Sequence, residues 1–162
     1  MPNPEPHPIT PDQLPAVALA VLDRHRFPML ATLDGTQPRV RPVTATWHEG
    51  FTVYFASLER FHKTGELRAA PQGELCYLDS DDDQVRITGL CERVSDRATQ
   101  EEAFRRDSLL RQYLGGPDNP EFTLWRVRPT RVRFMREWAL EYHEVPLPHG
   151  EATGLPGAGS TA

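Results

Sequence analysis

The sequence has few cysteines, no excess of basic residues and no long apolar run. Its two cysteines, Cys76 and Cys91, are not at metal-binding spacing, so we expect a reduced, buried pair. The net charge of -5 argues against a general nucleic-acid binder, which needs a basic surface to neutralise phosphates. No apolar run could span a bilayer and no start resembles a signal peptide, so we expect a cytoplasmic protein without a membrane partner.

Several common functional signatures are also missing. The chain has no phosphate-binding glycine loop, dinucleotide fingerprint or nucleophile elbow. Its six histidines show no metal spacing. The acidic run at 81–83 lacks the central glycine and distal glutamate of a calcium loop, so we interpret it as a solvated turn. These absences predict no metal site, and no residue can be assigned as a catalytic acid, base or nucleophile.

Proline, in contrast, is abundant and crowds both ends of the chain. There are 16 prolines, and they accompany a C-terminal stretch of Gly, Ala, Ser and Thr that cannot bury enough surface to order itself. We therefore expect a flexible proline-rich arm at 1–9, one domain at 10–145 and a disordered tail at 146–162.

Between these ends the hydrophobic pattern has mostly a period of two, which is typical of strands. An opening helix is predicted from Pro11 to about His25, because Thr10 and Gln13 form a capping-box pattern. Two further helices are predicted at 60–69 and from 96 or 99 to about 114. The strands are predicted at 28–33, 37–47 with a slip near Pro42, 51–57, 73–78, 84–94, 122–128 and 131–138. Hairpin connections, such as the Asp34-Gly35 turn, predict a closed or nearly closed antiparallel barrel.

Two segments have residues that suit an anion. In 37–44, Arg39 and Arg41 lie beside a kink in the strand, and guanidinium groups match phosphate oxygens. Periodicity alone favours the alternative that these arginines form the solvated face of the strand. In 54–63 a strand ends at Ser57 and a helix begins near Lys63, where free N–H groups attract phosphate. The alternative is an ordinary surface helix, although a basic first turn is disfavoured by the helix dipole.

A third segment, 83–89, begins with Gln84 after the acidic turn. An amide can both donate to and accept from the edge of a heterocycle, although one glutamine alone predicts nothing. The aromatic residues Trp47, Phe61 and Trp125 either need a partner surface or fill the protein's own core, and the sequence leaves both readings open.

In this order and spacing, the segments resemble the pyridoxamine 5'-phosphate oxidase-like split β-barrel superfamily, and within it the short general stress proteins. The matching motifs are 30–35 (LATLDG), 38–44 (PRVRPVT), 54–57 (YFAS), 63–71 (KTGELRAAP) and 84–89 (QVRITG). The resemblance implies a mainly β (α+β) fold, an antiparallel split barrel of six to seven strands with about three flanking helices.

The resemblance also implies an FMN site at the interface of a homodimer. The residues that match the strand along the flavin and its phosphate are Arg41, Val43 and Thr44. Those that match the next wall are Phe55, Ala56 and Ser57. His62 and Lys63 match the basic pair that binds the phosphate, and Gln84 matches a residue that reaches over from the partner subunit.

The chain departs from the family pattern at three points. His62 replaces a cation that is usually Arg or Lys, and histidine is mostly neutral at pH 7. Thr46 stands where the family has a basic substrate-binding residue, and the C-terminal Arg-x-His signature is missing. We therefore do not expect genuine oxidation of pyridoxamine phosphate.

The preferred interpretation is an FMN-dependent oxidoreductase that acts on a small molecule, either a nicotinamide nucleotide or an aromatic acceptor. One alternative is a deazaflavin (F420)-dependent reductase, which would need more basic charge for its longer anionic tail. Another is a non-enzymatic flavin- or haem-binding stress protein, and the last is an empty barrel that acts as a dimeric interaction module.

Overall fold

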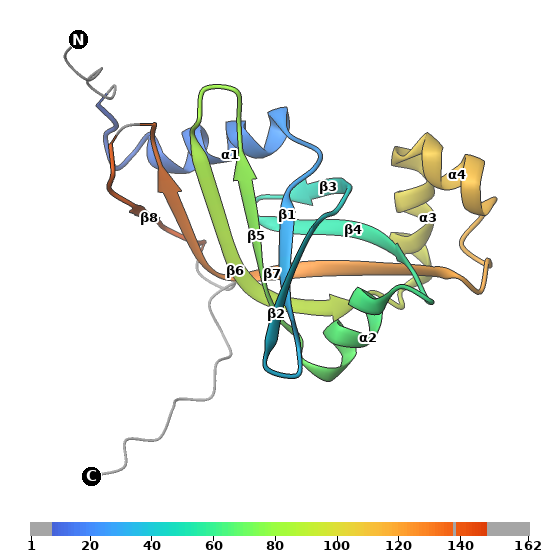
Figure 1. Cartoon of the computed structure of the whole chain (residues 1–162). Helices are drawn as coiled ribbons and strands as arrows, with labels where there is room; N and C mark the ends of the chain where they lie inside the picture. Colours follow the sequence, from blue (N-terminus) through green and yellow to red (C-terminus); the bar gives the residue numbers. More distant parts are fainter. Residues whose placement is uncertain (1–7, 138, 149–162) are drawn as a thin grey trace.

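Eight strands form one antiparallel sheet, and four helices flank it, in the part of the chain that this computed structural model describes, residues 8–137 and 139–148 (Figure 1). In chain order the elements are α1 (Leu14–Arg24), β1 (Met29–Asp34), β2 (Gln37–Pro42), β3 (Ala45–Glu49), β4 (Thr52–Leu58), α2 (His62–Ala69), β5 (Gln72–Leu78), β6 (Gln84–Arg93), α3 (Arg97–Arg106), α4 (Ser108–Leu114), β7 (Phe122–Met135) and β8 (His143–Val145). The predicted mainly β fold is confirmed.

The sheet closes on itself because its two end strands are consecutive in the chain. The strand order is β2-β1-β5-β6-β7-β4-β3, yet only Val43 and Thr44 separate β2 from β3. Along this link the Val43 N–H donates to the Pro28 carbonyl at 3.0 Å, and the Ala45 N–H donates to the Arg26 carbonyl at 2.8 Å. The chain thus leaves β1 and joins β4 within two residues, which makes the sheet a split barrel with few free edges.

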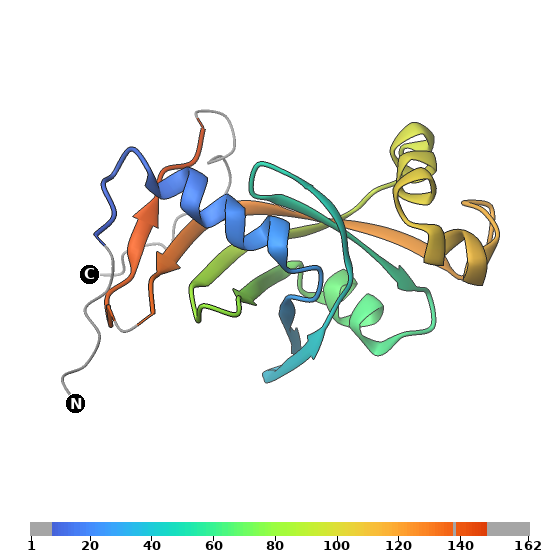
Figure 2. The same ribbon diagram turned by 90° about the horizontal axis from the view of Figure 1, so that it is seen from above.

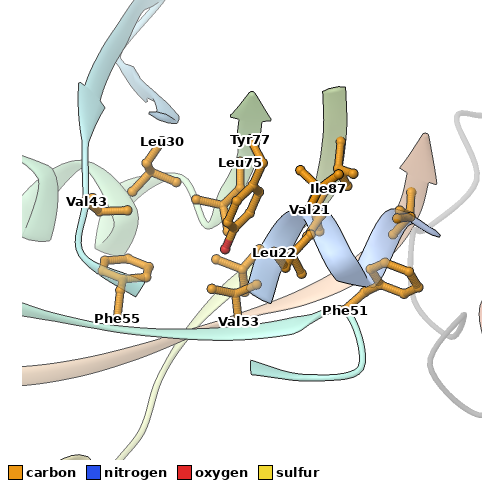
Figure 3. Close-up of a cluster of buried hydrophobic side chains, with 14 of the residues drawn as sticks. Val21, Leu22, Leu30, Val43, Phe51, Val53, Phe55, Leu75, Tyr77 and Ile87 are labelled. Atoms are coloured by element: carbon orange, nitrogen blue, oxygen red, sulfur yellow. The ribbon is translucent and has the colours of Figure 1, made fainter. Parts of the chain in front are cut away.

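The core lies inside this barrel and continues under α1 (Figure 3). Leu30, Leu75 and Ile87 are fully buried on the inner face of their strands. Ala18 and Val21 project from α1 onto the same cluster, so the helix covers the barrel beside β5 and β6 (Figure 2). Burial of each large apolar side chain stabilises the folded state by roughly 1.5–3 kcal/mol. Of the three aromatic residues that the sequence left open, Trp47 and Trp125 are buried and Phe61 is 44% exposed.

Five details differ from the sequence predictions. The strand predicted at 37–47 is two strands, β2 and β3, which Val43 and Thr44 separate. The regular turns of α1 begin at Leu14, because only half of the capping box forms, with the Thr10 N–H donating to Gln13 Oε1 at 3.2 Å. The predicted helix ending near 114 is two helices, since Asp107 is extended and its carboxylate accepts from the Leu109 N–H at 2.9 Å. The two strands predicted around Pro129 are one strand, β7, and the short β8 that pairs with it was not predicted.

The predicted arm and tail fall mostly outside the described residues, since 1–7 and 149–162 are not described. At the inner margins of these segments, Ile9 and Leu147 pack against the core. No helix among the described residues has the length and apolar character needed to cross a membrane.

The continuity of β7 depends on Gly89. The β6–β7 register shifts between Thr88 and Gly89, where Gly89 lies opposite Pro129, and a Cβ on Gly89 would overlap with the Arg128 carbonyl oxygen. We predict that Gly89→Ala lowers the free energy of unfolding by about 1–3 kcal/mol, because the obstructing atom is backbone and cannot rotate away.

Denaturant unfolding followed by circular dichroism would check this prediction. Gly65→Ala is the matched control, because Gly65 lies inside α2 and a Cβ there meets nothing within 4 Å. This substitution should raise the free energy of unfolding by up to about 1 kcal/mol. Equal effects of the two substitutions would contradict the assignment of Gly89 as a site of close backbone approach.

Candidate functional site

Three polar side chains from β1, β2 and α2 meet where α2 lies beside β1 (Figure 1). Arg41 Nη2 donates to Glu66 Oε2 at 2.7 Å. Arg41 Nη1 also donates to the Thr32 hydroxyl, which itself donates to Glu66 Oε2. Thr32 and Glu66 are only 3% and 9% exposed, and the Arg41 side chain is 23% exposed. One charge of each sign is therefore held in a poorly hydrated corner of the barrel. Together with the neighbouring Lys63, we call this group of side chains the basic corner.

Lys63, the only lysine in the sequence, lies next to this corner in the first turn of α2. Its Nζ stands 4.5 Å from the centre of the Phe61 ring, and the ion pairs formed by the described residues do not include it. Burial lowers the pKa of Lys63, the nearby Arg41 charge lowers it further, and Glu66 partly offsets both. A half-buried ammonium beside a guanidinium is an arrangement that a bound anion would stabilise.

A pocket of about 550 Å³ adjoins Phe61. Thr44, Ala56 and Ser57, three of the residues predicted to contact a flavin, line it together with Thr46. The opposite wall comes from α4 and the loop after it, and its side chains are mostly apolar: Leu109, Leu110, Tyr113 and Leu114, with Asn119 and Glu121 beyond them.

The α4 wall was not identified from the sequence. The available signal was that Leu109 and Tyr113, spaced four residues apart, form an apolar surface on a helix and are 47% and 77% exposed. That signal shows an unpartnered helix face, but it does not show which part of the barrel the face overlooks.

The remaining β4 and β2–β3 residues have different roles in the structure. The side chains of Val43 and Phe55 are buried in the core (Figure 3), so any contact they make with a ligand would be through the main chain. Ser57 Oγ lies 3.2 Å from Thr64 Oγ1, and Thr64 Oγ1 also donates to the Leu58 carbonyl at 2.9 Å. These bonds fix the start of α2 against the end of β4.

His62 and Lys63 have different surroundings, although they are adjacent in the chain. His62 is exposed and lines a smaller pocket of about 240 Å³ between α2 and the β1–β2 hairpin, whose walls include Asp34, Gly35 and Glu66. The structure thus places Lys63 beside Arg41 and turns His62 towards the hairpin.

Gln84 lies apart from the other predicted residues of the same chain. It opens β6, which is separated from β2 by β1 and β5, and its Oε1 accepts from the Tyr142 hydroxyl. Gln84 pairs with the exposed Leu78, whereas Arg41 pairs with the fully buried Leu30. Because directly paired residues share a face of a sheet, Gln84 projects from the outer face and Arg41 from the inner one.

The outer face that carries Gln84 also carries apolar side chains, which we call the outer apolar patch. Its members are Met29, Leu33, Val40 and Leu78, which are 47%, 38%, 66% and 53% exposed. Strand alternation and the pairing of β1 with β2 and β5 put them on one side of the sheet.

The cysteines and acidic residues offer no second reactive centre in the described part of the chain. Cys76 and Cys91 are free thiols, and burial raises the pKa of Cys91 to about 12 and also raises the pKa of Cys76. Both thiols are therefore protonated at neutral pH. Within residues 8–137 and 139–148, no cluster of three or more His, Cys, Asp or Glu side chains could hold a metal ion.

The antiparallel sheet places the protein among the split β-barrel proteins, and comparison with known proteins identifies the family. The family model described as pyridoxamine 5'-phosphate oxidase matches residues 14–136. The chain belongs to this family, which confirms the resemblance seen in the sequence. Comparison with curated proteins gave no match.

Three solved structures illustrate the likeness. A protein related to general stress protein 26, from Clostridium acetobutylicum, has a TM-score of 0.71 and 17% identity over 84% of this chain and 95% of its own. An FMN-binding protein related to pyridoxamine 5'-phosphate oxidase, from Nostoc punctiforme, has a TM-score of 0.66 and 17% identity over 80% and 86%. A haem-binding protein from Mycobacterium smegmatis has a TM-score of 0.68 and 18% identity over 85% and 58%. At these identities the likeness concerns the fold.

The electrostatics of Lys63 can be measured directly, because it is the only lysine. After reductive methylation with ¹³C-formaldehyde, the Lys63 resonance of the folded protein should titrate at a lower pH than the same resonance in the urea-unfolded protein. The reason is that burial and Arg41 lower the pKa of Lys63. Adding inorganic phosphate to the folded protein should raise that pKa. A folded-state pKa at or above the unfolded value would contradict the described environment.

The same shift has a consequence for stability. A lowered pKa in the folded state means that the unfolded chain binds the proton more tightly, so the protonated form of Lys63 disfavours folding. This unfavourable contribution is present below the folded pKa and disappears as the pH rises towards the ordinary lysine value.

Proposed function

We propose that this protein is a homodimeric flavoprotein that binds FMN and acts as an oxidoreductase on a small molecule. The phosphate would be held by Lys63 and Arg41, and the ring system would lie in the pocket lined by Thr44, Ala56 and Ser57. The observation that carries the proposal is the half-buried Lys63 ammonium, which has no carboxylate partner among the described residues and lies beside a second cation.

Several features support an FMN ligand over a simple anion. Lys63 lies over the ring of Phe61, which lines a pocket with mostly apolar walls, so one molecule with a charged end and a flat apolar end could reach from Lys63 into that pocket. The FMN-binding protein from Nostoc punctiforme shares the fold. Bound FMN would supply the redox chemistry, while the residues of this chain bind and orient it.

The pocket also suggests the class of substrate. The wall formed by Leu109, Leu110 and Tyr113 is apolar and suits a small aromatic acceptor or the ring of a nicotinamide nucleotide. Thr46, which stands where the family has a basic substrate-binding residue, also lines this pocket, so we do not propose oxidation of pyridoxamine phosphate.

A homodimer is supported by the outer apolar patch and by the position of Gln84. Four exposed apolar side chains on one sheet face form a surface that a second copy could cover. Gln84 projects from that face and does not meet the basic corner of its own chain, so in a dimer it could reach the flavin of the partner subunit.

Two alternatives have weaker support. The fold of the haem-binding protein from Mycobacterium smegmatis favours a haem carrier, but Tyr113 is the only described side chain lining the pocket of a type that ligates haem iron. A deazaflavin with a longer anionic tail would need further cations, and Arg60 at the pocket is already paired with Glu121 at 2.7 Å.

Titration of FMN, followed by quenching of its fluorescence, tests the proposed site. Arg41→Ala and Lys63→Ala should each weaken binding roughly tenfold or more, because each removes one charged hydrogen-bond donor to the phosphate. Arg39→Ala is the matched control, since Arg39 is on the same strand but is exposed and paired with Asp34, and it should change little. A wild-type protein that neither carries flavin nor binds added FMN would refute the proposal.

Mixed dimers test the role assigned to Gln84. If Gln84 completes the site of the partner subunit, Lys63→Ala and Gln84→Ala homodimers should both bind FMN weakly. A heterodimer of the two variants would contain one site with both residues intact and should regain up to half of the wild-type binding capacity. Mixtures with no recovery, although mass spectrometry detects the heterodimer, would place Gln84 outside the site.

A further inference from the structure

We infer that Glu66 is an internal counter-ion that competes with the phosphate of a ligand for Arg41, and so sets how strongly the site prefers a phosphate-bearing ligand. The inference rests on the proposed function, because it concerns the same basic corner. It adds a residue that acts against phosphate binding and thereby controls ligand specificity.

Glu66 already forms an ion pair with Arg41 within the chain. A single oxygen, Glu66 Oε2, accepts from Arg41 Nη2 at 2.7 Å and also from the Thr32 hydroxyl. Because Thr32 accepts from Arg41 Nη1 in turn, both terminal nitrogens of the guanidinium already have partners in the chain. The guanidinium keeps three other N–H groups that could donate to a phosphate, but a phosphate bound there would lie beside the Glu66 carboxylate and share the charge of Arg41 with it.

The charges of the corner lead to the same conclusion. Lys63 and Arg41 contribute two positive charges, and Glu66, three residues after Lys63 in α2, subtracts one. The negative charge of Glu66 also acts on Lys63, because it offsets part of the lowering of the Lys63 pKa by burial and by Arg41. The field of Glu66 therefore reaches both cations. Since Glu66 is 9% exposed, water screens its repulsion of a phosphate dianion only weakly.

A ligand without a phosphate would not experience this opposition. Riboflavin has the same ring system and ribityl chain as FMN but no charged end. The difference between the two affinities therefore isolates the contribution of the basic corner, and Glu66 should reduce that difference.

The test is to measure the dissociation constants of FMN and riboflavin for wild type and Glu66→Gln at one pH and ionic strength. Glutamine keeps the shape and an oxygen that can accept from Thr32 and Arg41, but it removes the charge. We expect FMN to bind about tenfold more tightly to the variant, and riboflavin to bind as it does to wild type. Glu101→Gln is the matched control, because it makes the same change in net charge on the exposed face of α3 and should leave both affinities unchanged.

Two results would overturn the inference. Unchanged or weaker binding of FMN by Glu66→Gln would mean that Glu66 positions Arg41 instead of competing for it. Equal tightening of FMN and riboflavin would mean that the substitution acts on the pocket rather than on the phosphate. Glu66→Met, a second neutral variant of similar size, has the same expected outcome and decides the question if glutamine prevents folding.

A measurement with inorganic phosphate separates this inference from the proposed function. The thermal unfolding midpoint is followed as phosphate replaces chloride at constant ionic strength. If no form of the protein binds FMN, the proposed function fails. A larger phosphate-induced rise in the neutral variant than in wild type would still support competition by Glu66, and an equal rise would refute it.

Discussion

The link between β2 and β3 is the constraint on which both the barrel and its site depend. Up to Pro42 the chain pairs with β1, and from Ala45 it pairs with β4. Proline has no N–H, so the ladder loses no donor where the chain leaves it. The change of partner places Arg41 beside β1 and α2, while Thr44, three residues later, faces the pocket shared with β4. The same closure thus forms the barrel and puts a residue of the basic corner and a residue of the pocket three positions apart in the chain.

The charge distribution explains why net charge is a poor guide to this site. The chain carries -5 overall, and most of its arginines form ion pairs on the surface. Examples are Arg126 with Glu92 at 2.8 Å and Arg97 with Asp118 at 2.6 Å. Pairs of this exposed kind contribute little stability, and they leave little positive field of their own. Against this neutralised background, Lys63 is distinctive because it is half-buried and outside the ion pairs of the described residues.

The sequence predicted best where local pattern decides the structure. The Asp34-Gly35 turn and the alternation of its flanking strands predicted the β1–β2 hairpin, and Asp34 does pair with Gln37. The end of α3 at Asp107 was missed because a distant residue helps to fix it: Arg26 donates to the Asp107 carboxylate at 3.2 Å. Continuous pairing through Pro129 was missed for a similar reason, since it relies on Gly89 in another strand.

In the candidate site, too, the sequence indicated what local motifs determine and missed what distant contacts determine. Family motifs indicated Arg41 and Lys63, which the structure brings together, and three residues that line the pocket. They did not indicate Glu66 as a counter-ion, because its contacts with Arg41 and Thr32 join two strands and a helix that are distant in the sequence. Nor could they show that Gln84 and Arg41 project from opposite faces, which follows only from the strand order and register.

The strand order also affects how the chain acquires its structure. β4 pairs with β7, and between them in the sequence lie α2, β5, β6, α3 and α4. During synthesis β4 therefore emerges with one edge unpaired and must wait for almost the whole domain before β7 can cover it. Folding through such distant pairings is slow compared with folding through local ones. The wall of the pocket that contains Ala56 and Ser57 thus gains its neighbouring strand only when the last third of the domain has left the ribosome.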